Sequence, residues 1–248
     1  NNEGDTSTMQ PYTQEEIDGT RAGLNPYIFP NVNWYNELFK KNSYNQNVNV
    51  NIRGGGKYVD YFSSITVNHL TGMIKDRSTE FFSYNNSINI MRYAFQNNIN
   101  AYLSKSTKLS LRLNVQLNDG SQPGVNVGTL FSQTMNTSPV EAPVYFPADG
   151  IASSIKWGTT DRLKPGLRTN PLASLANGYT DTFSSTVISA LEFEQGLDFI
   201  TKGLSFKALA SFKNYSYNAT GASANWNMYH LDSWSLNDGV YEFTTRLN

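Results

Sequence analysis

The clearest pattern along the chain is a strict alternation of aliphatic and polar residues over 108–118. A period of two places successive side chains on opposite faces of a β-strand, so one face of this strand is aliphatic and the other is polar. Such a strand separates an apolar phase from water. The apolar phase is either a protein core or a lipid bilayer. The aliphatic positions are Leu109, Leu111, Leu113, Val115 and Leu117.

The same kind of pattern predicts strands on both sides of this segment. With 108–118 they make six full strands, and a seventh begins at Val240. The other five strands are predicted over 47–53, 58–70, 87–103, 185–197 and 204–217.

Residues 1–45 form a separate region, which we predict to be an extracellular loop with two short helical turns. Thr13 followed by Glu16 fits a capping box and predicts the first turn. The second is predicted over 34–41, and the prolines between the two turns interrupt any regular element. Residues 46–248 then hold all the predicted strands.

The connections between the strands differ in length in a regular way. Successive turns of an antiparallel meander lie at opposite ends of the sheet, so the short turns gather at one end and the long loops at the other. Outer-membrane barrels sort their loops in this way, whereas a soluble sandwich has no reason to. The predicted short turns are near 54–57, 103–107 and 197–203, and the long loops are about 71–86, 119–180 and 215–238.

Tyrosine and phenylalanine cluster at the ends of the predicted strands. Aromatic girdles at both membrane interfaces are typical of transmembrane barrels, so this clustering also favours lipid as the apolar phase. The residues are Tyr58, Tyr61, Phe62, Phe81, Phe82, Tyr84, Tyr215 and Tyr217.

Composition excludes several classes of protein. A net charge of −1 gives no electrostatic case for a nucleic-acid partner. The absence of cysteine excludes a disulfide scaffold, thiolate metal sites and a cysteine nucleophile. No apolar run approaches the roughly 20 residues of a membrane-spanning helix, but a barrel strand needs only about 9–11 residues and shows alternation instead.

Several segments, in this order, resemble the SusC/RagA-type TonB-dependent transporters of the Bacteroidetes outer membrane. The resemblance runs from about Asn25 to about Tyr217. The shared segments are NWYNELF, QNVNVNIRGGGKYVDYFSSITVNHLTG, NNINAYLSKSTKLSLRLNVQ, RTNPLASLANGY and FEQGLDFITKGLSFKALASF.

The resemblance implies an all-β fold: an antiparallel up-and-down meander forming part of a transmembrane β-barrel of about 22 strands with long extracellular loops. Because six or seven strands cannot close such a barrel, and neither a plug domain nor its TonB box is present, we expect the chain to be a portion of a larger protein. The implied location is the bacterial outer membrane.

The function implied by the resemblance is TonB-dependent import of oligosaccharides or peptides, without enzymatic activity or cofactor. The implied partners are a SusD-like surface lipoprotein that acts as a lid, the TonB complex acting through the plug, outer-membrane lipid, and the solute. Two transporter–lipoprotein pairs would form a dimer.

Few residues suggest catalysis or metal binding. Glu192 and Glu194 share a face and suggest a glycosidase acid/base pair, but acidic residues on the water-filled side of a barrel strand explain them more simply. His69 and His230 lie far apart, without the carboxylate spacing of a metal site. We predict neither a catalytic residue nor a metal site.

Aromatic residues with polar neighbours in the long loops are the candidates for ligand contact, because aromatic faces stack on sugars. The other interpretation is that they pack the loops together or contact a partner. The candidates are Tyr145, Phe146, Trp157, Trp226, Tyr229 and Trp234.

Two functions from other classes remain as alternatives. A soluble β-sandwich that binds carbohydrate predicts a protein complete at about this length, without systematic loop sorting. A glycan-active enzyme predicts that Glu192 or Glu194 is essential for turnover.

Overall fold

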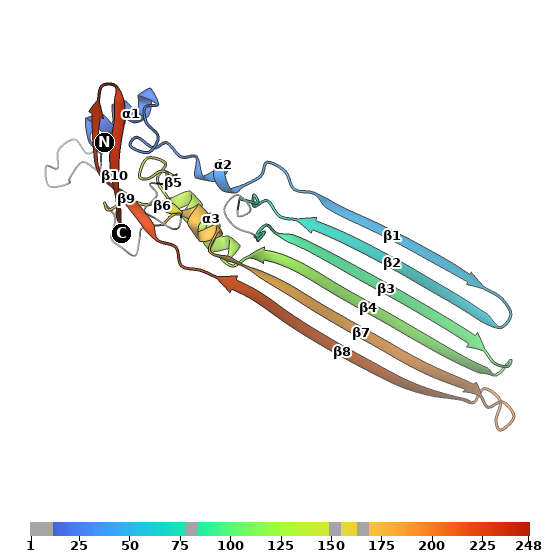
Figure 1. Cartoon of the computed structure of the whole chain (residues 1–248). Coiled ribbons are helices and arrows are strands. Elements are labelled where there is room, and N and C mark those ends of the chain that lie inside the picture. The colour runs from blue at the N-terminus through green and yellow to red at the C-terminus, as the bar shows by residue number, and fades with distance from the viewer. Residues whose placement is uncertain (1–11, 78–83, 149–154, 163–168) are drawn as a thin grey trace, which may run out of the picture.

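The computed structural model describes residues 12–77, 84–148, 155–162 and 169–248. Most of these residues form antiparallel β-sheet, with a few short helices (Figure 1). Among the described residues, no helix is long and apolar enough to cross a membrane.

The larger sheet is a meander of six long strands, each antiparallel to its neighbours. Its existence and strand order confirm the six predicted strands. Short turns join the strands at one end, and the longer connections lie at the other end (Figure 1). The strands, in spatial order, are β1 (Asn45–Gly55), β2 (Val59–Thr71), β3 (Asn89–Tyr102), β4 (Thr107–Pro123), β7 (Gly178–Gly196) and β8 (Ser205–Ser223).

β4, β7 and β8 extend well beyond their predicted limits at the end that carries the longer connections, whereas β3 begins two residues later than predicted. The predicted loop over 119–180 is shorter than expected, because β4 continues to Pro123 and β7 begins at Gly178. Polar residues occupy both faces of the extensions, as at Asp181 and Thr182. The strands remain paired there through backbone hydrogen bonds. Their side chains do not alternate between apolar and polar, so no local pattern in the sequence indicated a strand.

The predicted loop over 215–238 is also wrong, because β8 runs on to Ser223 and another strand follows. A smaller sheet forms there, with β9 (Met228–Asn237) between β10 (Val240–Leu247) and β6 (Lys156–Gly158), and β5 (Tyr145–Phe146) at its edge. The strand predicted at Val240 therefore exists, but it pairs with β9 instead of extending the larger sheet.

The described residues form four helices, which lie at the same end of the molecule as the smaller sheet (Figure 1). The predicted capping box is confirmed, since Glu16 N–H donates to Thr13 Oγ1 and Thr13 N–H donates to Glu16 Oε2. The helix predicted over 34–41 is also present and ends at Leu38. The helices are α1 (Gln14–Ala22), α2 (Trp34–Leu38), α3 (Val127–Asn136) and α4 (Pro171–Leu175).

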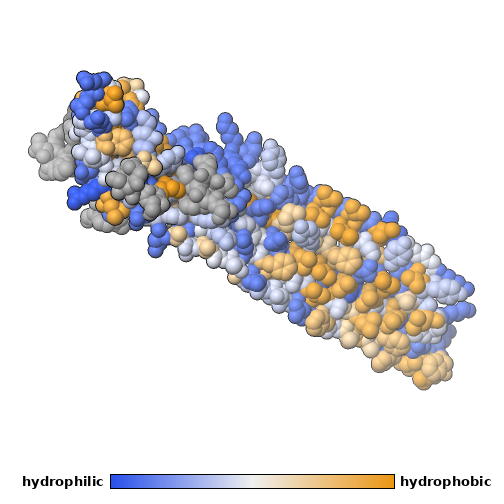
Figure 2. Space-filling view, in the orientation of Figure 1, coloured by the Kyte–Doolittle hydropathy of each residue, from blue (hydrophilic) through white to orange (hydrophobic). Residues whose placement is uncertain are grey.

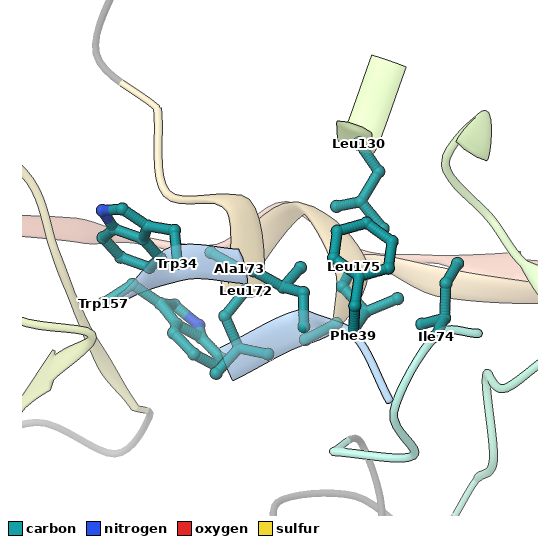
Figure 3. Close-up of a cluster of buried hydrophobic side chains, with 10 residues drawn as sticks. Trp34, Phe39, Ile74, Leu130, Trp157, Leu172, Ala173 and Leu175 are labelled. Carbon is teal, nitrogen blue, oxygen red and sulfur yellow. The ribbon is translucent and has the colours of Figure 1, made fainter. Parts of the chain in front are cut away.

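We call this end the loop globule: the described residues outside the six-stranded sheet and its short turns. It has its own hydrophobic core, to which α2, α3, α4, β6 and Ile74 contribute (Figure 3). Its largest fully buried side chains include Trp157, Leu38 and Ile74, each at most 1% exposed. Segments that are far apart in sequence are thus held in one packed unit.

Asn170 holds this unit together through polar contacts. Its Nδ2 donates to the backbone carbonyls of Val144 and Gly158, at 2.8 and 2.9 Å. Its Oδ1 accepts from the N–H groups of Leu172 and Ala173, both at 3.0 Å, and so caps α4. The fully buried carboxamide links α4 to two other segments.

The six-stranded sheet has no such core. Its register places Leu109, Leu111, Leu113, Val115 and Leu117 opposite odd-numbered residues of β3 and β7, so one apolar face extends across the sheet. Much of this face is exposed, as at Val50 (65%) and Ile65 (55%). Figure 2 shows hydrophobic residues gathered over the part of the sheet that lies toward the short turns.

Candidate functional site

The opposite, polar face of the six-stranded sheet has the chemistry of a binding site. It is formed by the even-numbered residues of β2, β3, β4 and β7 and the odd-numbered residues of β1 and β8. Carboxamides dominate it. They are Asn47, Asn49, Asn51, Asn68, Gln96, Asn98, Asn100, Asn114, Gln116 and Asn118.

Several of these amides donate hydrogen bonds to side chains on neighbouring strands. Asn49 Nδ2 donates to the hydroxyls of Ser64 and Thr66, and Asn118 Nδ2 donates to Ser184 Oγ at 3.1 Å. A carboxamide has two donor hydrogens and an acceptor with two lone pairs, so each can hold its neighbour and still bind a solute. The face therefore presents many preformed, uncharged hydrogen-bonding groups among its charged side chains.

A hollow of about 510 Å³ lies on this face, near the loop globule. Gly120 has no side chain to fill it, and Ile90 and Thr182 flank that glycine. Other lining residues include Arg92, Gln116, Asn118, Gln122 and Ser184. A cationic donor, amides and hydroxyls thus meet around one concave site.

The strand aromatics predicted to form interfacial girdles are divided between the two faces. Tyr61 lies on the apolar face, opposite Ile99. Phe62, Tyr215 and Tyr217 lie on the polar face, so for them the girdle prediction is wrong. The edge position of β8 leaves Tyr217 58% exposed, directly opposite Ser184. Phe81 and Phe82 lie outside the described residues.

Glu192 and Glu194 also face the polar side, nearer the short turns. Arg112 Nη1 lies 3.4 Å and Lys207 Nζ 3.2 Å from the Glu192 carboxylate, and Lys207 also lies 3.9 Å from Glu194. These ion pairs join β4, β7 and β8. Both glutamates thus belong to a cross-strand charge network on the polar face.

The loop aromatics predicted to contact ligand differ in their surroundings. Trp157 is fully buried in the core of the loop globule and Phe146 is 3% exposed, so neither can present a ring to a solute. For these two residues the prediction is wrong. The spacing of aromatic and polar residues gave no signal of this burial, because their contacts come from distant segments.

The remaining four candidates mainly hold the loops together. Trp226 packs against the core, and Trp234 contacts the ring of Phe29 at a centroid distance of 5.4 Å. The Tyr229 ring lies 5.3 Å from Lys156 Nζ. Only Tyr145 combines exposure with a concave position, at the rim of a hollow of about 330 Å³. Loop packing, the alternative interpretation, accounts for most of these rings.

The two histidines lie in separate places. His69 Nε2 is 2.7 Å from Asn89 Oδ1 in the larger sheet, and His230 Nε2 is 4.0 Å from Asp161 Oδ2 in the loop globule. No group of three or more metal-ligating side chains occurs within the ranges that the structure describes.

A charged cluster attaches α1 to the rest of the loop globule. The Arg162 guanidinium pairs with Glu16 and lies 5.2 Å from the centroid of the Tyr12 ring. Burial opposes ionisation of Glu16, but the Thr13 N–H and Arg162 outweigh it and lower the pKa of Glu16. Burial raises the pKa of Glu141, against the attraction of Arg162. Protonation in acid therefore removes a stabilising contribution of the Glu16 carboxylate and relieves a destabilising contribution of the Glu141 carboxylate.

Sequence reasoning did not single out the residues that line the hollow on the polar face. The alternation in 108–118 placed Gln116 and Asn118 on a polar face, and it gave no reason to prefer them. Only the register of the strands brings Arg92 beside Asn118. Comparison with protein-family models and with curated proteins gives no match for this chain.

Proposed function

We propose that this chain forms part of the wall of an outer-membrane β-barrel that imports large solutes. The observation that carries the proposal is the larger sheet. It has one exposed apolar face and one polar face, with short turns at one end and longer connections at the other. The apolar stretch of β4 from Leu109 to Leu117 is close to the about 9–11 residues that a tilted strand needs to cross a bilayer. Lipid would cover the apolar face.

In this proposal the polar face lines the water-filled interior, and the loop globule stands at the outer mouth. The edges of β1 and β8 would pair with further strands, because an unpaired edge in lipid leaves backbone groups unsatisfied. The resemblance to SusC/RagA-type transporters supports oligosaccharides or peptides as solutes. It also supports a SusD-like lid at the loop end, TonB coupling through a plug and a dimer of transporter–lipoprotein pairs.

Site-directed spin labelling tests the assignment of the two faces. The chain contains no cysteine, so single cysteines can be introduced without background. Leu113→Cys and Val115→Cys label the apolar face, and Asn114→Cys and Gln116→Cys are matched controls on the same strand. In lipid vesicles, the first pair should collide with oxygen dissolved in the bilayer and the second pair with a water-soluble nickel chelate.

Two results would contradict the proposal. Labels at positions 113 and 115 that are shielded from both reagents would show that protein covers the apolar face, as in a soluble sandwich. Equal access of the nickel chelate at all four positions would show that neither face meets lipid.

A further inference from the structure

Charge is distributed unevenly between the two faces of the larger sheet. On the polar face, cations outnumber carboxylates although the whole chain has a net charge of −1. The cations are Arg53, Arg92, Lys108, Arg112, Lys207 and Lys213, and the carboxylates are Asp60, Glu192 and Glu194.

The imbalance is strongest near the loop globule. The polar-face carboxylates all lie toward the short turns, where Glu192 pairs with Arg112 and Lys207, and Asp60 accepts hydrogen bonds from Asn100 and Tyr102. Lys213 lies in the middle row, and the rows between it and the loops contain Arg92 and no carboxylate. The acidic residues of the strands at that end, Asp119 and Asp181, lie on the opposite face. This half of the polar face is therefore positive.

Arg92 is the charged residue in the hollow of about 510 Å³. Within the described ranges, no carboxylate forms an ion pair with it, and its direct neighbours across the strands are Asn68 and Asn118. Asn118 already donates to Ser184, which orders the wall beside the guanidinium. A guanidinium offers a planar fork of donors that matches an oxyanion in two parallel hydrogen bonds.

We propose that this hollow binds an anionic oxygen group, a carboxylate or a sulfate, on the solute, with Arg92 as its charged partner. The side chains that form hydrogen bonds to the neutral hydroxyl or amide groups beside the anion are then Gln116, Asn118 and Ser184. Tyr217, directly opposite Ser184, places an aromatic ring on the same face beside the hollow, where it would contact the body of the solute. The inference rests on the proposed function for the nature of the solute, and it adds a preference for negative charge.

Calorimetry with matched solutes tests this preference on the intact protein in detergent. One pair is oligogalacturonate and its neutral methyl ester, and the other is a sulfated oligosaccharide and its desulfated form. At least one anionic form should bind more tightly than its neutral partner. Arg92→Gln should weaken that binding about tenfold, which corresponds to one charge-assisted hydrogen bond, and leave the neutral form unchanged.

Arg53→Gln is the matched control, because it removes a cation from the same face farther from the hollow. It should leave the anion preference intact, and Arg92→Lys should restore part of the loss. A preference confined to one pair identifies carboxylate or sulfate as the group. No preference in either pair, or equal losses in Arg92→Gln and Arg53→Gln, would overturn the inference. Failure of the spin-label alternation would instead overturn the proposed function, since that experiment involves no anion.

Discussion

Trp157 in the loop globule has no exposed surface, whereas Val50 in β1 leaves 65% of its surface exposed. Both are apolar side chains in β-strands of one chain. In the loop globule, helices and a small sheet enclose the apolar residues from several sides. The larger sheet is one layer thick, so its apolar face remains uncovered. The globule supplies its own apolar interior, and none of the described residues supplies one for the sheet.

The largest expected effect concerns the core of the loop globule. Trp157→Ala should destabilise it by about 3–5 kcal/mol, because the change removes a fully buried aromatic side chain and leaves a cavity. Hydrogen exchange should show faster opening of α2 and α4, with the middle of β4 unaffected. Tyr145→Ala, opposite Trp157 in β5 but partly exposed, is the control and should cost much less. Equal loss of protection in the sheet would show that the two regions unfold as one.

The corresponding test of the sheet places a charge on the apolar face. Leu113→Arg should cost about 2–4 kcal/mol in a bilayer, the range for arginine on the lipid side of a barrel near the midplane. Asn114→Arg, the next residue on the opposite face, should cost little. Urea unfolding of the intact protein in lipid vesicles measures both. Equal effects of the two substitutions would mean that the faces do not differ in environment.

Asn170 tests whether the globule depends on buried polar contacts as well as on apolar packing. Asn170→Asp keeps the oxygen that caps α4 but removes both donors to Val144 and Gly158. The Gly158 carbonyl loses this donor, the Val144 carbonyl keeps only the Gly158 N–H, and a buried carboxylate oxygen faces both, so the change should cost about 2–4 kcal/mol. Asn126→Asp is the control, because Asn126 caps α3 through Oδ1 and is exposed. Thermal unfolding should separate the two variants, and equal midpoints would refute the role of the donors.

A smaller effect is expected where α1 packs on the globule. A Cβ atom at Gly19 would lie 2.5 Å from the ring of Phe29, so Gly19→Ala must displace that ring. Overpacking of this kind costs about 1–3 kcal/mol. Hydrogen exchange of α1 should increase, whereas Glu15→Ala on the exposed side of the helix should have little effect. Unchanged exchange in Gly19→Ala would show that α1 is not held through this contact.

The smallest expected effect is a dependence on pH at the same helix. Because the folded pKa of Glu16 lies below its ordinary value of 4.5, its contribution is present above that value and is lost as pH falls through the folded pKa. Glu141 acts in the opposite sense: its folded pKa is raised, so its contribution is lost as pH rises through it. Protection factors of α1 should therefore fall in acid, and Glu16→Gln should remove that dependence. A pH profile unchanged by Glu16→Gln would contradict the role of this carboxylate.

The sheet was predictable because its signals are local. The period of two in 108–118 assigned each side chain to a face, and the register confirms that assignment across β3, β4 and β7. The capping box at Thr13 and Glu16 likewise lies within four residues of chain. The loop globule was not predictable in this way, because Trp157 and Phe146 are buried by segments that are distant in sequence.

The amino-acid sequence by itself determined the six-stranded meander, the sorting of its connections and the polarity of most of its side chains. These features follow from alternation and turn composition, which act over a few residues. Only the tertiary structure decided that most of 215–238 forms strands and that most of the loop aromatics pack together. It also decided that Arg92 lines a hollow in which no described carboxylate pairs with it. The burial of a side chain and the charge around it depend on which segments lie next to it. Those neighbours are determined by strand register and core packing, which a local sequence pattern does not encode.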